Sequence, residues 1–363
     1  MKLRVVLVGP LPPPAGGMAN QTRQLARLLK ESGVTVQLVQ NNAPYRPAWI
    51  AHVRGLRAMF RLVPYLVALW RALRAADVAH VMANSGWAWH LFAAPAIWLA
   101  RLRGVPVLVN YRGGEAEAFL QRQGRWVRPT LRLAHVLAVP SGFLRAIFVR
   151  YGIAAEIVPN IVDLTRFTPG GPRAPGQHIV VTRNLEQIYD LPTALRAFAK
   201  VRGRYPAARL TIAGSGPELA ALQRLAHDLG IADAVRFTGR LDNEQVAALY
   251  READLLLNPS TVDNMPISLL EAMASGVPIV STNVGGVPYL VEHERTALLV
   301  PARDADAMAA AVLRMFDDAG LRDRIVGAAL QACRAYAWER VQPQLFAAYA
   351  RCAGRPVWRE SAL

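Results

Sequence analysis

The chain has 363 residues, of which 53% are hydrophobic and 19% are charged, so it can bury two substantial cores and is neither a disordered nor a collagen-like chain. Its two cysteines, Cys333 and Cys352, exclude a disulfide framework and a four-cysteine zinc site. The formal net charge is +16, which favours an anionic partner.

The positive charge is concentrated in the first part of the chain. Residues 1–165 contain 20 Lys and Arg against 6 Asp and Glu, whereas residues 166–363 contain 22 against 20. A basic region beside a nearly neutral one indicates that the first faces nucleic acid, anionic lipid or a phosphorylated substrate. No recognition motif and no stacking pattern of aromatic and basic residues supports nucleic acid, so we expect no nucleic-acid partner.

The N-terminal elements alternate between strands and helices. Leu3–Val8 is a short apolar strand, a loop rich in Gly and Pro follows it, and Met18–Glu31 has the apolar spacing of a helix. The apolar run before Gly9 is too short for a secretion signal, so we expect a cytoplasmic protein. Further strands are predicted over Val34–Val39, Val78–Ala83, Val105–Asn110 and Val136–Val139.

A long helix is predicted over Ala48–Ala76, where arginines lie among large apolar residues. This mixture suits a helix on an anionic membrane surface; the alternative is a core helix with solvated arginines. Residues 78–100 lack charged side chains, but polar residues and Pro95 interrupt them, which favours strand, turn and helix over a membrane span. The residues assigned to the membrane surface are Arg54, Arg57, Arg61, Arg71, Arg74, Trp49, Phe60, Leu62, Tyr65, Leu66, Leu69 and Trp70.

Residues 166–177 are rich in Pro and Gly and predict a linker, after which the alternation resumes. Continuous apolar strands between helices are typical of parallel sheets covered on both faces. We therefore predict an α/β protein with two Rossmann-like, doubly wound domains, over residues 1–165 and 178–337, and a terminal helix over residues 338–363. Strands of the second domain are predicted over His178–Thr182, Arg209–Ala213, Ala234–Phe237, Asp254–Leu257, Pro278–Ser281 and Thr296–Val300.

Two glycine-containing loops are candidate ligand sites, because each lies between a predicted strand and a predicted helix. They are Gly16-Gly17 and Gly214-Ser215-Gly216. Glycine lets the backbone approach a ligand, and the following helix N-terminus offers unpaired N–H groups to an anion. Neither loop has the Lys-Ser/Thr of a P-loop, so for Gly16-Gly17 a tight turn without a ligand stays an alternative.

The most informative segment surrounds a helix predicted over Pro266–Ser275. Asp263 precedes this helix, and Glu271 lies in its second turn among apolar neighbours. The helix N-terminus can receive a diphosphate, while the two carboxylates can accept hydrogen bonds from sugar and ribose hydroxyls. The residues expected to bind the ligand there are Asn264, Met265, Pro266, Ile267 and Ser268.

This part of the chain resembles the donor-binding domain of retaining, GT-B-fold glycosyltransferases of family 4. The similarity is strong over about residues 160–352 and weaker before them. The matching residues are Asn160-Ile-Val-Asp163, Phe167-Thr-Pro169, Arg183, Ala213-Gly-Ser-Gly-Pro217, Phe237-Thr-Gly239, Glu271-Ala-Met-Ala-Ser-Gly-Val-Pro278, Gly285-Gly286, Ala297-Leu-Leu-Val-Pro301 and Trp338-Glu-Arg340. The resemblance implies a GT-B fold whose terminal helix packs back on the first domain.

Three departures from the family pattern bear on the site. The first acid of the usual Glu pair is Asp263, and no lysine follows Arg183 within the next few residues. Arg112 stands where the family often has a histidine. The resemblance implies that Arg183 binds the diphosphate, Glu271 the ribose and Asp263 the transferred sugar. It also implies that Gly16 and Gly17 approach the phosphates as the domains close, and that Arg112 supplements the missing lysine.

The implied activity is retaining transfer of a hexose from a nucleotide diphosphate sugar to a saccharide or a polyprenyl-diphosphate-linked saccharide. We expect a role in surface polysaccharide assembly and peripheral association with the inner face of the cytoplasmic membrane. No metal and no cofactor are expected, because the Asp-x-Asp at Asp304–Asp306 opens a predicted helix, where carboxylates act as caps. The rival functions are a nucleotide-sugar epimerase of the same fold and a basic nucleic-acid-binding protein.

Overall fold

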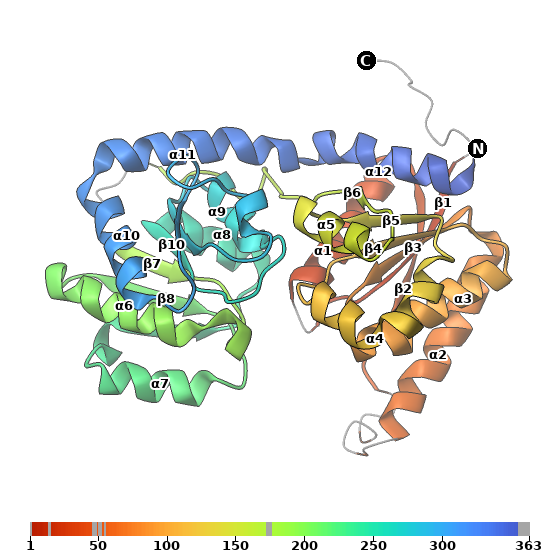
Figure 1. The fold of residues 1–363 in the computed structure, drawn as a ribbon, viewed down its shortest axis with the longest axis horizontal. Coiled ribbons are helices and arrows are strands. Elements are labelled where there is room, and N and C mark those ends of the chain that lie inside the picture. The colour runs from red at the N-terminus through yellow and green to blue at the C-terminus, as the bar shows by residue number, and fades with distance from the viewer. Residues whose placement is uncertain are drawn as a thin grey trace. The chain divides into compact units, whose positions relative to one another are not determined.

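The computed structural model describes residues 2–13, 16–45, 49, 53, 56–171 and 176–354, and side chains within these ranges except at 56–58. The chain forms two compact units (Figure 1). Unit 1 comprises Met1–Ile161 and Trp338–Leu363, and unit 2 comprises Val162–Ala337. Each unit contains a six-stranded sheet in which every pair of neighbouring strands is parallel.

Unit 1 has the strand order β2-β1-β3-β4-β5-β6. Its strands are β1 (Arg4–Gly9), β2 (Thr35–Gln40), β3 (Val78–Ala83), β4 (Val107–Tyr111), β5 (Val136–Val139) and β6 (Glu156–Ile157). Its helices are α1 (Gly17–Glu31), α2 (Leu56–Ala72), α3 (Ala94–Leu102), α4 (Ala116–Leu131), α5 (Gly142–Arg150) and α12 (Trp338–Ala353). One core joins the sheet to α2, α3, α4 and α5, and the other joins it to α1 and α12. Both faces are therefore covered, as the apolar strands predict.

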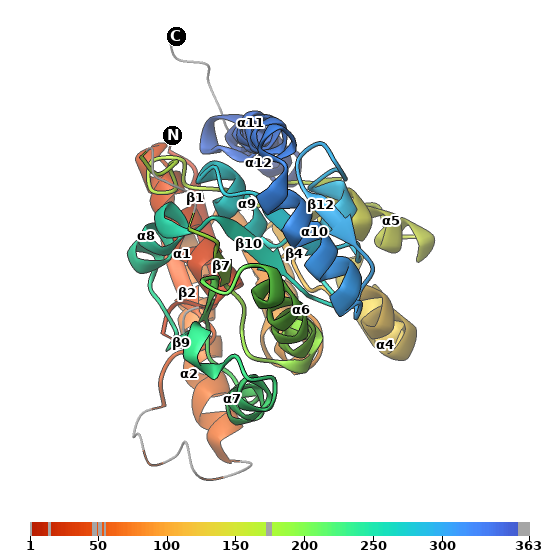
Figure 2. The ribbon, with the colours of Figure 1, turned by 90° about the vertical axis from the view of Figure 1, so that its left-hand side faces the viewer.

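Unit 2 has the strand order β12-β11-β10-β7-β8-β9. Its strands are β7 (His178–Val181), β8 (Arg209–Ala213), β9 (Val235–Gly239), β10 (Leu255–Asn258), β11 (Ile279–Thr282) and β12 (Leu298–Val300). Its helices are α6 (Leu191–Arg204), α7 (Leu219–Asp228), α8 (Asn243–Glu252), α9 (Ile267–Ala274), α10 (Ala305–Asp317) and α11 (Ala319–Cys333). Helix α6 packs between α7 and α10, and α9 packs on α11 (Figure 2).

The predicted helix over Ala48–Ala76 is shorter in the structure, and two of its proposed membrane residues are buried. Tyr65 and Leu69 of α2 are 3% and 0% exposed, and the Tyr65 hydroxyl donates to the Phe92 carbonyl oxygen at 2.8 Å. Assigning these two side chains to a membrane surface is therefore wrong. Phe60 is exposed, and so is Trp49. Arg54 lies outside the described residues, as does the side chain of Arg57.

The charge-free stretch over residues 78–100 forms separate short elements. Strand β3 has the predicted bounds and is fully buried. The helix after it is interrupted by a π-helical turn over Trp89–Ala93. The 3.6-residue spacing of apolar side chains that predicts an α-helix does not reveal such a turn. No helix within the described ranges is both long and apolar enough to cross a bilayer.

Candidate donor-binding site

The predicted site residues of unit 2 gather where its strand order reverses. Strand β7 lies between β10, which comes later in the chain, and β8. The loop after β7 carries Arg183, and the loop after β10 carries Asp263. Ligands of doubly wound sheets bind beyond the carboxyl ends of the strands at such a reversal, so the topology alone marks this edge as the candidate site.

Arg183 and Asp263 are joined directly, although 80 positions separate them. The Arg183 Nη2 atom forms an ion pair with Asp263 Oδ2, and both side chains are 12% exposed. Arg183 Nε donates to Asn258 Oδ1 at 2.9 Å, and Asn258 Nδ2 in turn donates to Ser281 Oγ at 2.9 Å. These bonds fix the guanidinium and leave Nη1 without a partner among the described side chains. No local sequence pattern indicated this pairing, because the family resemblance implied a sugar-binding role for Asp263.

Asp263 has two opposing influences on its ionisation. Burial raises the pKa of this carboxyl, while Arg183 and the backbone N–H of Asn264 oppose the rise. That N–H donates to Asp263 Oδ1 at 2.9 Å. One carboxylate oxygen therefore faces Arg183, and the other anchors the backbone that leads into α9.

The first N–H groups of helix α9 have no side-chain cap. Pro266 is the N-cap residue and provides no capping hydrogen bond. The Ser268 hydroxyl is buried and has no hydrogen-bond partner in the part of the chain that the structure describes. Buried polar groups in native proteins nearly always have partners, and an uncapped helix N-terminus attracts anions. Met265, by contrast, contributes its side chain to the core.

Glu271 is the fifth residue of α9, and its carboxyl forms no hydrogen bond or ion pair with any described residue. Burial raises its pKa to about 8, against the opposing charges of Arg183 and Arg166. The side chain is half-buried, and a partly desolvated carboxyl without a hydrogen-bond donor costs free energy in the folded protein. This cost is typical of a group that completes its hydrogen bonds with a ligand.

The glycines around this site have a packing role that the sequence did not indicate. A Cβ atom on Gly214 would lie 1.9 Å from the Arg183 carbonyl oxygen, and one on Gly216 would lie 2.3 Å from that of Leu185. Likewise, a Cβ atom on Gly286 would lie 1.8 Å from the Asn264 carbonyl oxygen. These glycines let neighbouring loops pack against the backbone that carries Arg183 and Asp263. Their direct contact with a ligand stays a prediction, as it does for Ser215.

Gly16 and Gly17, at the start of α1 in unit 1, differ from these glycines. No described heavy atom lies within 4 Å of the Cβ position of either residue. Packing within unit 1 therefore does not require glycine here. Open space at both positions agrees with a backbone that a ligand approaches.

Arg112, also in unit 1, lies in a buried polar network rather than on an open surface. Its Nε donates to Asn110 Oδ1 at 3.1 Å, and its Nη1 donates to Gln21 Oε1 at 3.4 Å and Asn160 Oδ1 at 2.5 Å. Burial lowers its pKa to about 10, so it stays charged at neutral pH. It has no carboxylate partner among the described residues. Nη2 is the one guanidinium nitrogen without a bond to them.

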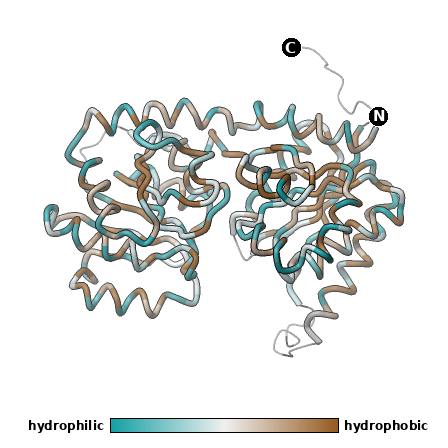
Figure 3. Tube along the Cα trace, in the orientation of Figure 1, coloured by the Kyte–Doolittle hydropathy of each residue, from teal (hydrophilic) through white to brown (hydrophobic). Residues whose placement is uncertain are grey.

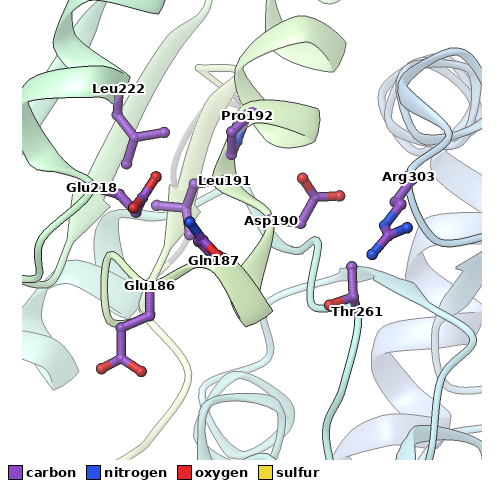
Figure 4. A pocket seen from close by; sticks show the side chains of 9 residues that line it. All are labelled: Glu186, Gln187, Asp190, Leu191, Pro192, Glu218, Leu222, Thr261 and Arg303. Atoms are coloured by element: carbon purple, nitrogen blue, oxygen red, sulfur yellow. The ribbon is translucent and has the colours of Figure 1, made fainter.

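A small pocket of about 230 Å³ lies on the loops that follow β7, β8, β10 and β12. Its lining combines three carboxylates, from Glu186, Asp190 and Glu218, with one cation, Arg303. Figure 4 shows Asp190 and Arg303 on either side of Thr261. Arg183, Asp263 and Glu271 do not line it, and no sequence motif predicted it.

Acidic side chains form no cluster suited to a metal in the described ranges, where no group of three or more His, Cys, Asp or Glu could hold an ion. Asp304, in the Asp-x-Asp segment, is the N-cap of α10, and its carboxylate accepts from the Ala307 N–H at 2.8 Å.

Comparison with known proteins finds two family descriptions that match this chain and solved structures that are similar over most of its length. "Glycosyl transferases group 1" matches residues 173–331 and "Glycosyltransferase Family 4" matches residues 15–166. A GDP-mannose-dependent alpha-(1-6)-phosphatidylinositol monomannoside mannosyltransferase of Mycobacterium tuberculosis is 34% identical over 271 residues, which are 66% of this chain and 68% of that protein.

A second relative and a solved structure extend this comparison. WcaL of Salmonella typhimurium, named as a colanic acid biosynthesis glycosyltransferase, is 34% identical over 157 residues, 41% of this chain and 39% of that one. Anabaena HepE in complex with UDP and glucose has a TM-score of 0.73 at 17% identity, covering 95% of this chain and 99% of HepE. At that identity, the similarity to HepE establishes the fold alone.

Proposed function

This chain belongs to glycosyltransferase family 4, and we propose that it is a retaining enzyme that transfers a hexose from a nucleotide diphosphate sugar to a saccharide acceptor. Its GT-B fold and glycosyltransferase activity are properties of the family. The observation that carries the finer proposal is the half-buried carboxyl of Glu271, which has no hydrogen-bond or ion-pair partner among the described residues. It lies one turn into an uncapped helix, beside the Arg183–Asp263 pair.

In this proposal the leaving diphosphate lies at the N-terminus of α9. The N–H groups of Ile267 and Ser268, the Ser268 hydroxyl and Arg183 Nη1 stabilise the negative charge that grows as the sugar–phosphate bond breaks. Cleavage moves the bonding electron pair onto the phosphate oxygen, and the anomeric carbon becomes positively charged. The acceptor hydroxyl oxygen then bonds to that carbon on the face that the diphosphate leaves, which retains the configuration, and its proton passes to the departing phosphate oxygen. No side chain has to donate a proton to a diphosphate leaving group, and no metal or cofactor is required.

The two carboxyl groups have different parts in this account. Glu271 accepts hydrogen bonds from the ribose hydroxyls, which compensates for its burial once it is ionised. Asp263 orients Arg183 and contacts the transferred sugar through its remaining lone pairs. Asp263 is therefore both a positioning residue for the guanidinium and a determinant of donor preference.

Names of the relatives support the choice of substrate classes. One relative depends on GDP-mannose and acts on a phosphatidylinositol mannoside, and another is named for colanic acid biosynthesis. We propose a lipid-linked saccharide, a polyprenyl-diphosphate saccharide in particular, as the acceptor for unit 1 in surface polysaccharide assembly. In unit 1, Gly16 and Gly17 would contact phosphate through their backbone, and Arg112 would donate through Nη2.

The test is a screen of radiolabelled UDP- and GDP-hexoses with the purified chain and a polyprenyl-diphosphate saccharide. We expect free nucleotide diphosphate and a glycoside with retained anomeric configuration, from one donor. Formation of an epimeric nucleotide sugar without an acceptor would instead support the epimerase. Salt-sensitive RNA binding without transfer would support the nucleic-acid-binding alternative.

We also propose that the protein associates peripherally with the inner face of the cytoplasmic membrane. The charge of unit 1 supports this, with 24 Lys and Arg against 7 Asp and Glu, because each basic residue near an anionic surface contributes about 1 kcal/mol. Sedimentation with vesicles tests the proposal. Binding should require anionic lipid and weaken with salt, whereas equal binding to neutral vesicles, or no binding to either kind, would contradict it.

A further inference from the structure

A groove of about 640 Å³ runs between α2 and α3 of unit 1. Its apolar lining consists of Leu66, Val67 and Trp70 from α2 and Pro95, Trp98 and Leu99 from α3. The groove is shallow and open, so it covers one side of an apolar chain rather than enclosing a compact ligand. Exposed apolar grooves of this kind mark contact with an apolar partner rather than with water.

Exposed apolar side chains extend the groove along both helices. On α2, Met59, Val63 and Val67 recur at every fourth position and are 62%, 53% and 43% exposed, so they share one face of the helix. On α3, Trp98 and Leu102 are 54% and 74% exposed and are again four positions apart. Figure 3 shows hydrophobic residues along α2. Val67 and Trp98 line the groove, and the other exposed residues continue an apolar strip along the same two helices.

Unpaired cations border this strip. Arg71 and Arg74 line the groove and form no ion pair with a carboxylate of the described residues. The Arg103 guanidinium lies 3.4 Å from the ring centre of Trp70, and its Nε is buried without a hydrogen-bond partner in those residues. Arg71, Arg74 and Arg103 thus make the groove complementary to negative charge.

We propose that the α2–α3 groove binds a hydrocarbon chain of an anionic phospholipid, whose phosphate is held by Arg71 and Arg74. A second copy of the chain is a poorer occupant, because symmetric pairing would bring the same unpaired arginines together. A free phosphate compound would leave the apolar strip in water. The proposal deepens the proposed membrane association, but it does not depend on the catalytic site.

The first test is binding of the full chain to phosphatidylglycerol-containing vesicles and to pure phosphatidylcholine vesicles. We expect Trp98→Asp and the double variant Arg71→Ala/Arg74→Ala each to weaken binding to the anionic vesicles about tenfold or more. Matched controls are Trp126→Ala, an exposed tryptophan on α4 outside the groove, and Arg122→Ala/Arg145→Ala, which removes the same charge elsewhere in unit 1. Both controls should bind within about twofold of the unsubstituted chain.

The second test separates chain insertion from surface adsorption. Cys333 and Cys352 are buried, so a Trp98→Cys variant can be labelled selectively with a polarity-sensitive fluorophore. We expect a blue shift of its emission on phosphatidylglycerol vesicles, and no shift for the same label at Trp126→Cys. Equal binding to phosphatidylcholine, unchanged binding of Trp98→Asp, or bound protein with no shift at position 98 would each overturn the proposal.

A third measurement keeps this proposal distinct from the proposed transfer activity. Transfer to a water-soluble saccharide acceptor should be unchanged in Trp98→Asp, whereas vesicle binding should be unchanged in Glu271→Gln. Loss of soluble transfer in Trp98→Asp would show that the substitution damages unit 1 as a whole. In that case the groove assignment would fail, since its variants would report folding rather than lipid.

Discussion

Units 1 and 2 share one architecture and differ in what their surfaces and loops carry. Both have six parallel strands covered by helices on both faces. Unit 1 carries 24 Lys and Arg against 7 Asp and Glu, whereas unit 2 carries 18 against 19. Of the exposed large hydrophobic residues described, eleven lie in unit 1 and two, Leu219 and Tyr289, lie in unit 2.

At the carboxyl edges of the two sheets, by contrast, it is the loops of unit 2 that carry the candidate site. Unit 2 places an ion pair, an uncapped helix and a half-buried carboxyl together there. In unit 1, the corresponding edge has Arg112 in a network of neutral amides. The same fold thus supports a compact polar site in one unit and a basic, apolar exterior in the other, so function follows from the site and not from the fold.

The largest expected effect sharpens this comparison by disabling unit 2 alone. Glu271→Gln and Arg183→Ala should each reduce transfer at least about 10²-fold, because each removes a charge-assisted contact to the donor. Steady-state kinetics with the identified donor measure this. The matched control is Glu252→Gln, an exposed carboxyl on α8, which should stay near the activity of the unsubstituted enzyme. Normal turnover of Glu271→Gln at saturating donor would refute the site.

Glycine substitutions separate packing in unit 2 from ligand approach in unit 1. Gly286→Ala places a Cβ atom 1.8 Å from the Asn264 carbonyl oxygen, so we expect the free energy of unfolding to fall by about 2–3 kcal/mol. A Cβ atom on Gly16 has no described heavy atom within 4 Å. The Gly16→Ala variant should therefore keep its stability while its kcat/KM falls. Denaturant titrations and kinetics measure the two effects. Equal loss of stability in both variants would remove the distinction.

The stability of unit 2 should depend on the ionisation of Glu271. Its pKa in the folded protein is about 8, above the ordinary value of 4.5, so the folded protein keeps a proton that the unfolded chain has lost. The free energy of unfolding should therefore fall as pH rises from 4.5 to 8, by about 2 kcal/mol after allowance for partial hydration. The free energy of unfolding of Glu271→Gln should not fall over this pH range. Parallel pH profiles of the two proteins would contradict the burial argument.

A smaller effect is expected from Asp263→Glu, which keeps the charge and adds one methylene. The pair with Arg183 can re-form with a small shift, so the rate should change less than about tenfold while the preference among hexoses changes. Kinetics with several nucleotide sugars measure this. Unchanged rates and unchanged preference together would show that Asp263 does not contact the sugar.

No effect at all is expected from removing divalent metal. The proposed diphosphate site consists of Arg183, the Ser268 hydroxyl and the backbone N–H groups of α9, which together replace a bridging cation. Transfer measured in excess EDTA should equal transfer in buffer. Complete loss that Mg²⁺ or Mn²⁺ restores would contradict this account of the leaving group.

Local sequence patterns predicted the sheets well. Strand Val78–Ala83 has the predicted bounds, because a continuous apolar run between breakers is typical of a buried parallel strand. The helix expected over Pro266–Ser275 forms at Ile267–Ala274, because proline favours the first turn and Gly276 the end. Such features depend on neighbouring residues only, which a sequence displays directly.

Contacts between distant residues could not be predicted in the same way. The pairing of Arg183 with Asp263 joins loops that meet only after β7 and β10 become neighbours. The buried face of α2 could not be predicted either, because the helix is apolar on more than one side. The spacing of its apolar residues does not show whether Tyr65 or Val63 faces the core. The packing role of Gly286 likewise depends on Asn264, which is close in space and distant in sequence.

Hydrogen–deuterium exchange of the unsubstituted protein, with and without its nucleotide sugar, tests the assignment of donor binding to unit 2 most directly. We expect the donor to slow exchange most in peptides covering Met265–Glu271, whose first helical N–H groups have no side-chain cap. Exchange along α2 should not change. Protection confined to unit 1, with none around α9, would contradict the assignment of donor binding to unit 2.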